Sequence, residues 1–268
     1  MTQWITINDT EYAYSVTGKG ETIVLLHGFT GTKETWQSVT SYLAESFRVF
    51  VIDLPGHGQT RNEKIITMEQ FVDDLHLLTR NLQLDSFHLL GYSLGGRSAL
   101  SYAMKYPKTL RSLILESASP GLKTKEEREA RIKQDETLVE MMQEQGLFQF
   151  VSYWENIPLF ESQKRLPESI QEQVRRERLS QSEAGLIQSL RGMGTGAQLS
   201  WWESLPSLEI PVLLIVGSID EKFVNINKTM NRLLKNSMLH IVEDAGHAVH
   251  LEQVEKFAKI VKEYLAQI

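Results

Sequence analysis

A serine between two glycines, Gly91-Tyr92-Ser93-Leu94-Gly95, separates a short apolar run from an amphipathic segment. The apolar run Phe87–Leu90 predicts a buried strand, and Leu94–Tyr106, which ends before Pro107, predicts a helix. Glycine allows a tight turn where a side chain would clash, so the serine hydroxyl would stand at the helix N-terminus, where negative charge is favoured. The pattern therefore predicts a strand, a sharp turn and a helix, as in parallel sheets with crossover helices.

Further short apolar runs have the length of buried strands. They are Ile23–Leu26, Arg48–Ile52, Ser112–Leu115, Val212–Val216 and Met238–Val242. Helical patterns lie between them, and Met68–Leu82 places Phe71, Leu75 and Leu78 on one face. Strands that alternate with helices predict the α/β class, with a mostly parallel central sheet flanked by helices.

Residues 120–205 interrupt this alternation. They are charged and helical, contain no strand-like run, and have their longest helical pattern at Glu126–Gln145. The sheet pattern resumes at Ile210-Pro211. We interpret the stretch as a helical cap inserted into a core of residues 1–119 and 206–268, because the core is incomplete without its C-terminal strands. A separate second domain is the alternative.

Composition excludes several classes of function. A net charge of -6 without a dense basic stretch argues against nucleic-acid binding. The absence of cysteine excludes disulfides, thiolate metal sites and cysteine nucleophiles. Met1–Thr6 lacks the basic start of a signal peptide, and no apolar run approaches the ~20 residues of a membrane helix. We therefore expect a cytoplasmic protein without a membrane partner; the sequence carries no signal for its oligomeric state.

Ser93 needs a base if it is to react. His247 follows Gly246 and the predicted strand Met238–Val242, while Asp220 follows the strand Val212–Val216. Serine, aspartate and histidine in this chain order are typical of the α/β-hydrolase fold, in which G-x-S-x-G forms the nucleophile elbow. We predict that His247 takes the Ser93 proton and that Asp220 fixes the imidazole tautomer and stabilises its charged form.

Other residues could take two of these roles. His250 is the nearest competitor of His247, and we expect it to support the site or to lie at the surface. Three further carboxylates could orient the base in place of Asp220: Glu221, Glu243 and Asp244.

The glycine-rich stretch His27-Gly28-Phe29-Thr30-Gly31 follows another predicted strand. A loop there can present a backbone N–H to developing negative charge, so we predict the N–H groups of Phe29 and Leu94 as oxyanion donors. A plain turn is the alternative. The loop Asp53-Leu54-Pro55-Gly56-His57-Gly58 is expected to be structural, with His57 closing a turn.

Arg97 lies one helical turn after Ser93. A cation near a helix N-terminus opposes the helix dipole, and a buried unpaired cation is costly, so an anionic group should meet it. Either an internal carboxylate or a carboxylate-bearing substrate would satisfy this requirement, and the residues alone leave both open. Most other cations of residues 120–205 are expected on solvated helix faces.

The segment Gly91-Tyr92-Ser93-Leu94-Gly95-Gly96-Arg97 resembles the signature of the MenH family, the 2-succinyl-6-hydroxy-2,4-cyclohexadiene-1-carboxylate (SHCHC) synthases of menaquinone biosynthesis. The resemblance covers nearly the whole chain. It is also carried by His27-Gly28-Phe29, the Asp53–Gly58 loop, Pro120-Gly121-Leu122 and Ala245-Gly246-His247.

The resemblance implies a carbon–oxygen lyase of α/β-hydrolase fold that needs no cofactor and no metal. Such an enzyme eliminates pyruvate from 2-succinyl-5-enolpyruvyl-6-hydroxy-3-cyclohexene-1-carboxylate, a small polycarboxylate. The Ser93–His247 pair can then abstract a ring proton or act as a nucleophile, and both roles need the same residues.

The resemblance also implies the residues that bind substrate. Arg97, Arg131 and Arg178 would bind its carboxylates, and Tyr92 and Trp154 would line the pocket. The neighbours Arg175 and Arg176 are alternatives to Arg178.

Two other functions compete with this hypothesis. A hydrolase of esters or C–C bonds in an acidic small molecule would use the same triad and cap. A non-catalytic binding module is a further alternative, against which the complete triad argues.

Overall fold

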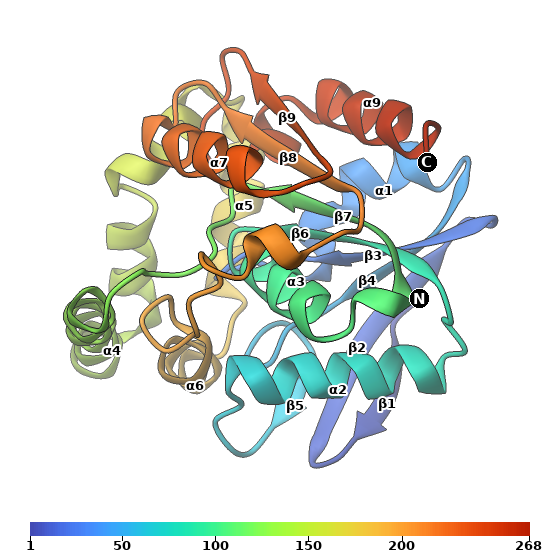
Figure 1. Cartoon of the computed structure of the whole chain (residues 1–268). Helices are drawn as coiled ribbons and strands as arrows, with labels where there is room; N and C mark the ends of the chain where they lie inside the picture. Colours follow the sequence, from blue (N-terminus) through green and yellow to red (C-terminus); the bar gives the residue numbers. More distant parts are fainter.

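The computed structural model describes residues 1–268, and a nine-stranded sheet runs through its centre (Figure 1). The strand order is β1-β2-β4-β3-β6-β7-β8-β9, and β5 pairs with β2. The strands are β1 (Gln3–Ile7), β2 (Thr10–Thr17), β3 (Glu21–Leu26), β4 (Phe47–Ile52), β5 (Arg61–Asn62), β6 (Phe87–Tyr92), β7 (Leu110–Glu116), β8 (Val212–Gly217) and β9 (Ser237–Val242).

The helices connect these strands. The α-helices are α1 (Gln37–Leu43), α2 (Met68–Asn81), α3 (Leu94–Lys105), α4 (Lys125–Trp154), α5 (Glu168–Leu179), α6 (Glu183–Met193), α7 (Glu221–Leu233), α8 (Val249–Glu252) and α9 (Val254–Leu265). The 3₁₀ helices are η1 (Lys33–Trp36), η2 (Pro107–Thr109), η3 (Pro158–Arg165) and η4 (Leu205–Ser207).

The six strands predicted from the sequence form the parallel part of the sheet, in the spatial order β4-β3-β6-β7-β8-β9. This confirms the predicted α/β class. The antiparallel edge made by β1, β2 and β5 was not predicted. Its strands are polar or mixed in sequence, and β1 is mostly exposed, whereas the central strands are continuous apolar runs that a sequence pattern reveals more clearly.

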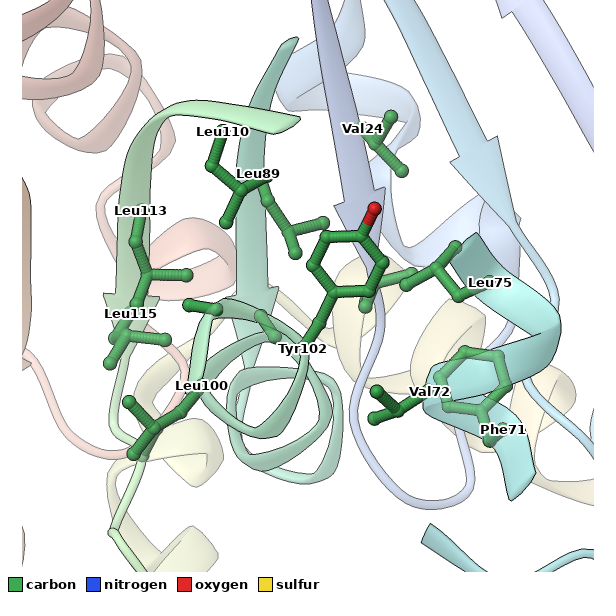
Figure 2. Close-up of a cluster of buried hydrophobic side chains, with 14 of the residues drawn as sticks. Val24, Phe71, Val72, Leu75, Leu89, Leu100, Tyr102, Leu110, Leu113 and Leu115 are labelled. Atoms are coloured by element: carbon green, nitrogen blue, oxygen red, sulfur yellow. The ribbon is translucent and has the colours of Figure 1, made fainter. Parts of the chain in front are cut away.

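Helices cover both faces of the sheet. On one face, Phe71 and Leu75 of α2 and Tyr102 of α3 pack toward strand residues such as Leu89, as Figure 2 shows. On the other face, α1 and α9 contact each other over a second apolar cluster. The central parallel strands, such as β6 and β8, are thus buried on both sides, and their carboxyl ends support the loops that follow them.

Residues 120–205, which we call the helical segment, contain α4, η3, α5 and α6 but no strand. Figure 1 shows α4 and α6 together at one side of the sheet. The segment has a small apolar cluster of its own, including Val139, Phe150 and Leu186. The predicted helix at Glu126–Gln145 is the first part of α4, which is kinked at Gly146 (φ 80°) and continues to Trp154. No helix of the chain is both long and apolar enough to cross a membrane.

Candidate active site

Ser93 occupies a strained turn between β6 and α3. Its φ is 50°, a region that residues other than glycine rarely adopt. A Cβ on Gly91 would lie 2.2 Å from the Gly95 carbonyl oxygen, and a Cβ on Gly95 would lie 2.2 Å from the Leu26 carbonyl oxygen. Both positions therefore need glycine, because neighbouring backbone atoms lie too close for a side chain. The Ser93 N–H donates to the Glu116 carbonyl at 2.9 Å, which helps to hold the strained turn.

His247 and Asp220 complete a chain of hydrogen bonds with Ser93. His247 Nε2 lies 3.1 Å from Ser93 Oγ, and His247 Nδ1 lies 2.6 Å from Asp220 Oδ2. An ionised carboxylate only accepts hydrogen bonds, so Nδ1 carries the imidazole proton and Nε2 is free to accept one from the serine. Asp220 is itself held at the N-cap of α7, where its Oδ1 accepts from the Phe223 N–H at 3.3 Å.

The residues considered as alternatives to Asp220 and His247 do not take part in this chain of hydrogen bonds. Glu221, Glu243 and Asp244 are exposed, and none of them bonds to His247. His250 is buried, and its Nδ1 lies 2.9 Å from the carboxylate of Glu116. Of the four candidate carboxylates, Asp220 is therefore the one that bonds to the imidazole of His247.

Two acidic residues that the sequence did not single out support this arrangement. Glu116, fully buried, accepts from the His250 backbone N–H at 2.9 Å as well as facing its ring. The Tyr92 ring contacts both histidines, with centroids 4.6 Å from His250 and 5.4 Å from His247. Glu252 accepts from the Gly246 N–H at 2.8 Å and so fixes the loop just before His247.

Phe29 and Leu94, the predicted oxyanion donors, line the same cavity as Ser93. No acceptor in the chain bonds to the backbone N–H of either residue, whereas the adjacent Gly95 N–H is bonded to His27. The fold thus leaves free N–H groups on two segments beside the serine, as developing negative charge requires.

The cavity has a volume of about 610 Å³ and is lined by residues of the sheet loops and of the helical segment. Tyr92, Ser93 and His247 come from the sheet loops, and Trp154 and Phe160 come from the helical segment. This size suits a small organic ligand. No group of three or more histidine or acidic side chains is arranged to hold a metal ion.

Arg97 lines this cavity as a buried cation without an ion-pair partner. Its Nη1 donates to the Met193 carbonyl at 2.9 Å and to Gln198 Oε1 at 2.6 Å, both neutral acceptors. Burial, and then the nearby Arg131, lower the pKa of Arg97 to about 9, with Asp135 opposing, so the guanidinium stays charged at neutral pH. No internal carboxylate forms the ion pair that one of the two sequence hypotheses required.

The other arginines differ in their partners. Arg131 lines the cavity and bonds to Asp135 at 2.7 Å. Arg178 lies instead in an adjoining cavity of about 540 Å³, and Phe160 lines both spaces. The Arg178 guanidinium lies 4.9 Å from the centroid of the Phe160 ring and donates to Gln163 at 3.2 Å.

Arg175 and Arg176, the alternatives to Arg178, each have a carboxylate partner. Arg175 bonds to Glu155, and Arg176 bonds to Glu172. Arg178 is the buried one of the three, and burial lowers its pKa. It is therefore the arginine of α5 that is buried without a carboxylate partner, and an anionic ligand would stabilise it.

Several buried polar atoms of the cavity wall have no hydrogen-bond partner in the protein. They are Trp154 Nε1, Ser117 Oγ and Ser189 Oγ, and the amide nitrogen of Gln198 is unpartnered beside Arg97. Unsatisfied buried polar groups cost roughly 1–3 kcal/mol each, so folded proteins retain few of them. Three of the eight such atoms in the chain thus belong to residues that line this cavity.

Comparisons with known proteins agree with this geometry. A family model described as alpha/beta hydrolase fold matches residues 21–254. A putative 2-succinyl-6-hydroxy-2,4-cyclohexadiene-1-carboxylate synthase of Bacillus subtilis is 46% identical over 98% of both chains. The synthase of Klebsiella pneumoniae is 32% identical over 85% of this chain and 87% of its own.

Two solved structures are similar over almost their whole length. MenH from S. aureus superposes with a TM-score of 0.91 at 34% identity, covering 95% of this chain and 98% of that one. A thermophilic esterase from Thermogutta terrifontis, in a malate-bound structure, has a TM-score of 0.86 at 29% identity and covers 100% and 98% of the two chains.

Proposed function

Because the chain belongs to the SHCHC synthase (MenH) family within the α/β-hydrolase fold, we propose that it eliminates pyruvate from 2-succinyl-5-enolpyruvyl-6-hydroxy-3-cyclohexene-1-carboxylate to give SHCHC in menaquinone biosynthesis. One observation carries the proposal beyond the family. Arg97 is a buried cation without an internal carboxylate, in the same cavity as Ser93 and His247. A polycarboxylate substrate supplies the missing anion.

In the proposed mechanism, Ser93, His247 and Asp220 act together as the base. His247 Nε2 takes the Ser93 proton, and the serine oxygen removes the proton of ring carbon 2, which the neighbouring succinyl ketone makes acidic. The 3.1 Å and 2.6 Å contacts of His247 support this relay. The N–H groups of Phe29 and Leu94 then stabilise the enolate oxygen that forms.

Electron movement accounts for the change from one ring double bond to two. The carbon 2 electron pair forms the 2,3 double bond, the 3,4 double bond moves to 4,5, and the carbon 5–oxygen bond to the enolpyruvyl group breaks. The leaving enolpyruvate takes a proton on carbon and becomes pyruvate. Hydrogen and charge balance without an oxidant or a reductant.

Substrate binding is proposed for Arg97, Arg131 and Arg178, with Tyr92 and Trp154 in the wall. Arg97 and Arg178 are supported by their burial without a carboxylate partner, and Trp154 by its unpartnered Nε1. Phe160 lies between the two cavities, so movement of its ring would join the Arg178 space to the space beside Ser93.

We also propose that the helical segment, residues 120–205, is a cap on a core formed by residues 1–119 and 206–268. Its lack of strands, its separate apolar cluster and its share of the cavity wall support this division. Such a cap would exclude water from the enolate.

An ester hydrolase is the second candidate function. The same serine–histidine geometry suits nucleophilic attack, and the Thermogutta terrifontis protein, 29% identical, is an esterase. This route predicts an acyl group on Ser93 during turnover, whereas elimination with serine as a base predicts none.

The deciding experiment is a pyruvate assay on purified protein with the enolpyruvyl substrate, in the presence of a chelator and without nucleotide. We expect stoichiometric pyruvate and SHCHC from the parent and a far slower release from Ser93→Ala. Mass spectrometry of the parent during turnover should show no adduct on Ser93. Good turnover of simple esters without pyruvate release would refute the proposed function.

A further inference from the structure

The loop that carries Phe29 is held in a strained conformation. The next residue, Thr30, has a φ of 67°, a left-handed value that β-branched residues rarely adopt. Strained backbone of this kind persists only where surrounding contacts hold it. One contact comes from His57, whose Nε2 accepts from the Thr30 N–H at 3.3 Å. The direction of the Phe29 N–H therefore depends on contacts from outside the loop.

Glu177 of α5 supplies three such contacts through one carboxylate oxygen. Its Oε1 accepts from the N–H and the hydroxyl of Thr32, both at 2.8 Å, and from the hydroxyl of Thr35 at 2.5 Å. Thr32 is the N-cap of η1, so the carboxylate fixes the end of the loop where the 3₁₀ helix begins.

Gln181, two residues beyond α5, holds the strained part directly. Its Nε2 donates to the carbonyl of Thr30 at 3.2 Å and to that of Gly31 at 3.1 Å. Its Oε1 accepts from the Gly58 N–H at 3.0 Å. The buried side chain thus joins the Phe29 loop to the loop after β4, and all its hydrogen-bond contacts are to backbone.

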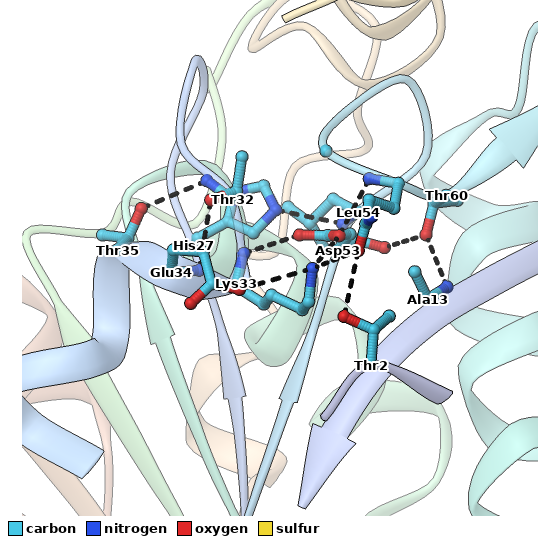
Figure 3. A network of polar contacts seen from close by, with 12 residues as sticks. Thr2, Ala13, His27, Thr32, Lys33, Glu34, Thr35, Asp53, Leu54 and Thr60 are labelled. Carbon is cyan, nitrogen blue, oxygen red and sulfur yellow. Dashed lines mark hydrogen bonds and ion pairs between the residues drawn. The ribbon is translucent and has the colours of Figure 1, made fainter. Parts of the chain in front are cut away.

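On its core side, the loop is held by a separate polar network, which Figure 3 shows. Buried Asp53 accepts from the Lys33 N–H at 2.6 Å and from Lys33 Nζ at 3.1 Å. His27 Nε2 accepts from the Leu54 N–H at 3.0 Å. The contacts of Glu177 and Gln181 with the Phe29 loop are therefore the ones that depend on the position of α5.

The same helix carries Arg178, buried next to Glu177. We propose that Glu177 and Gln181 are positioning residues that orient the Phe29 N–H only while α5 is docked on the loop. An anion held by Arg178 would stabilise the docked helix and so couple substrate binding to the oxyanion donor. This inference rests on the proposed function, because it assigns Phe29 and Arg178 the roles given there.

Steady-state kinetics of Glu177→Ala and Gln181→Ala test the inference. Since the Phe29 N–H acts on charge that develops in the transition state, each change should lower kcat by about 10- to 100-fold while KM changes less than about threefold. Glu177→Gln keeps an acceptor oxygen and should recover most of the kcat. Gln173→Ala, on an exposed position of α5, should match the parent.

A merely structural role predicts a different result: a lower melting temperature with an unchanged kcat for the folded fraction. That result, or a change confined to KM, would overturn the inference. The same variants are also assayed with p-nitrophenyl acetate, whose tetrahedral intermediate needs the same donor. If the parent hydrolyses this ester but releases no pyruvate from the enolpyruvyl substrate, the proposed elimination is refuted. The kcat of the Glu177→Ala and Gln181→Ala variants on the ester then still decides whether these residues position the Phe29 N–H.

Discussion

The side-chain oxygen of Gln198 accepts a 2.6 Å hydrogen bond from Arg97, and no carboxylate approaches the guanidinium within ion-pair distance. A neutral acceptor orients the arginine without cancelling its charge. Gln198 lies 101 residues further along the chain, in the part of the helical segment that follows α6. The folded protein therefore keeps an oriented positive charge in the cavity wall.

Replacing Arg97 should affect catalysis and not stability. Arg97→Ala is expected to lower kcat/KM by an amount equivalent to about 2–5 kcal/mol, because it removes a charge-assisted contact with a substrate carboxylate. Its melting temperature should stay close to that of the parent, because relief of the buried charge and of the dipole conflict offsets the lost hydrogen bonds to Met193 and Gln198. Arg97→Lys should recover only part of the activity, because an ammonium lacks the planar two-pronged geometry.

A matched control variant shows whether a loss of kcat/KM depends on the position of Arg97 or follows the removal of any arginine. Arg191→Ala removes an exposed guanidinium of α6 that pairs with Glu136, and it should leave kcat/KM unchanged. A large loss of thermal stability in Arg97→Ala with kcat/KM intact would assign Arg97 a structural role instead.

The serine and the histidine should behave as one unit. Ser93→Ala and His247→Ala are each expected to lower kcat by about 1000-fold or more, and the double variant should be little worse than either single variant. Rapid-quench measurement of pyruvate gives the three rates. Strictly additive losses would show that the 3.1 Å contact between them does not transfer the proton.

Trp154 allows a test of binding that does not disturb the base. Its buried Nε1 has no partner in the protein, so Trp154→Phe removes an unsatisfied donor while keeping an aromatic ring. We expect KM to rise by about fivefold, the loss of one hydrogen bond of roughly 1 kcal/mol, with little change in the unfolding free energy. A tryptophan that is only a packing element would lose stability and leave KM unchanged.

The central fold and the proposed catalytic residues follow from local sequence patterns. Ser93 and Asp220 follow the buried apolar strands β6 and β8, His247 follows the edge strand β9, and parallel strands bring their carboxyl ends to one edge of the sheet. Chain order leaves Glu221 open as an alternative to Asp220, and the structure separates the two, because Asp220 bonds to His247 and Glu221 is exposed. The half-exposed strands β1 and β2 lack this signal and were missed.

The supporting residues depend on contacts between distant segments, which no local pattern encodes. Glu116 meets His250 across 134 positions, and Gln181 meets Thr30 across 151. Glutamates and glutamines of this kind are also common on solvated helix faces, so residue type does not distinguish them. For the same reason, the sequence did not indicate that Phe160 lies between Arg178 and the main cavity.

Acid stability should report the buried histidine behind the Phe29 loop. Burial first, and then the nearby His27, lower the pKa of His57 to about 3, with a contact to the Pro55 carbonyl opposing. In the unfolded chain a histidine has a pKa of about 6.5, so the unfolded state binds more protons between these two values. Stability is therefore unaffected by this group above pH 6.5 and is lost as the pH falls below it.

At pH 5, protonation of His57 in the unfolded chain alone should cost about 2 kcal/mol, from 1.5 pH units at 1.36 kcal/mol each. His57→Gln removes this titration and keeps an acceptor for the Thr30 N–H, so its unfolding free energy should fall less between pH 8 and pH 5 than that of the parent. Urea unfolding at a series of pH values measures the difference, with His240→Gln on the edge strand β9 as the matched control. Parallel stability curves for the parent and His57→Gln would mean that His57 takes up a proton as readily in the folded protein as in the unfolded chain, and this would contradict a buried imidazole that accepts from the Thr30 N–H.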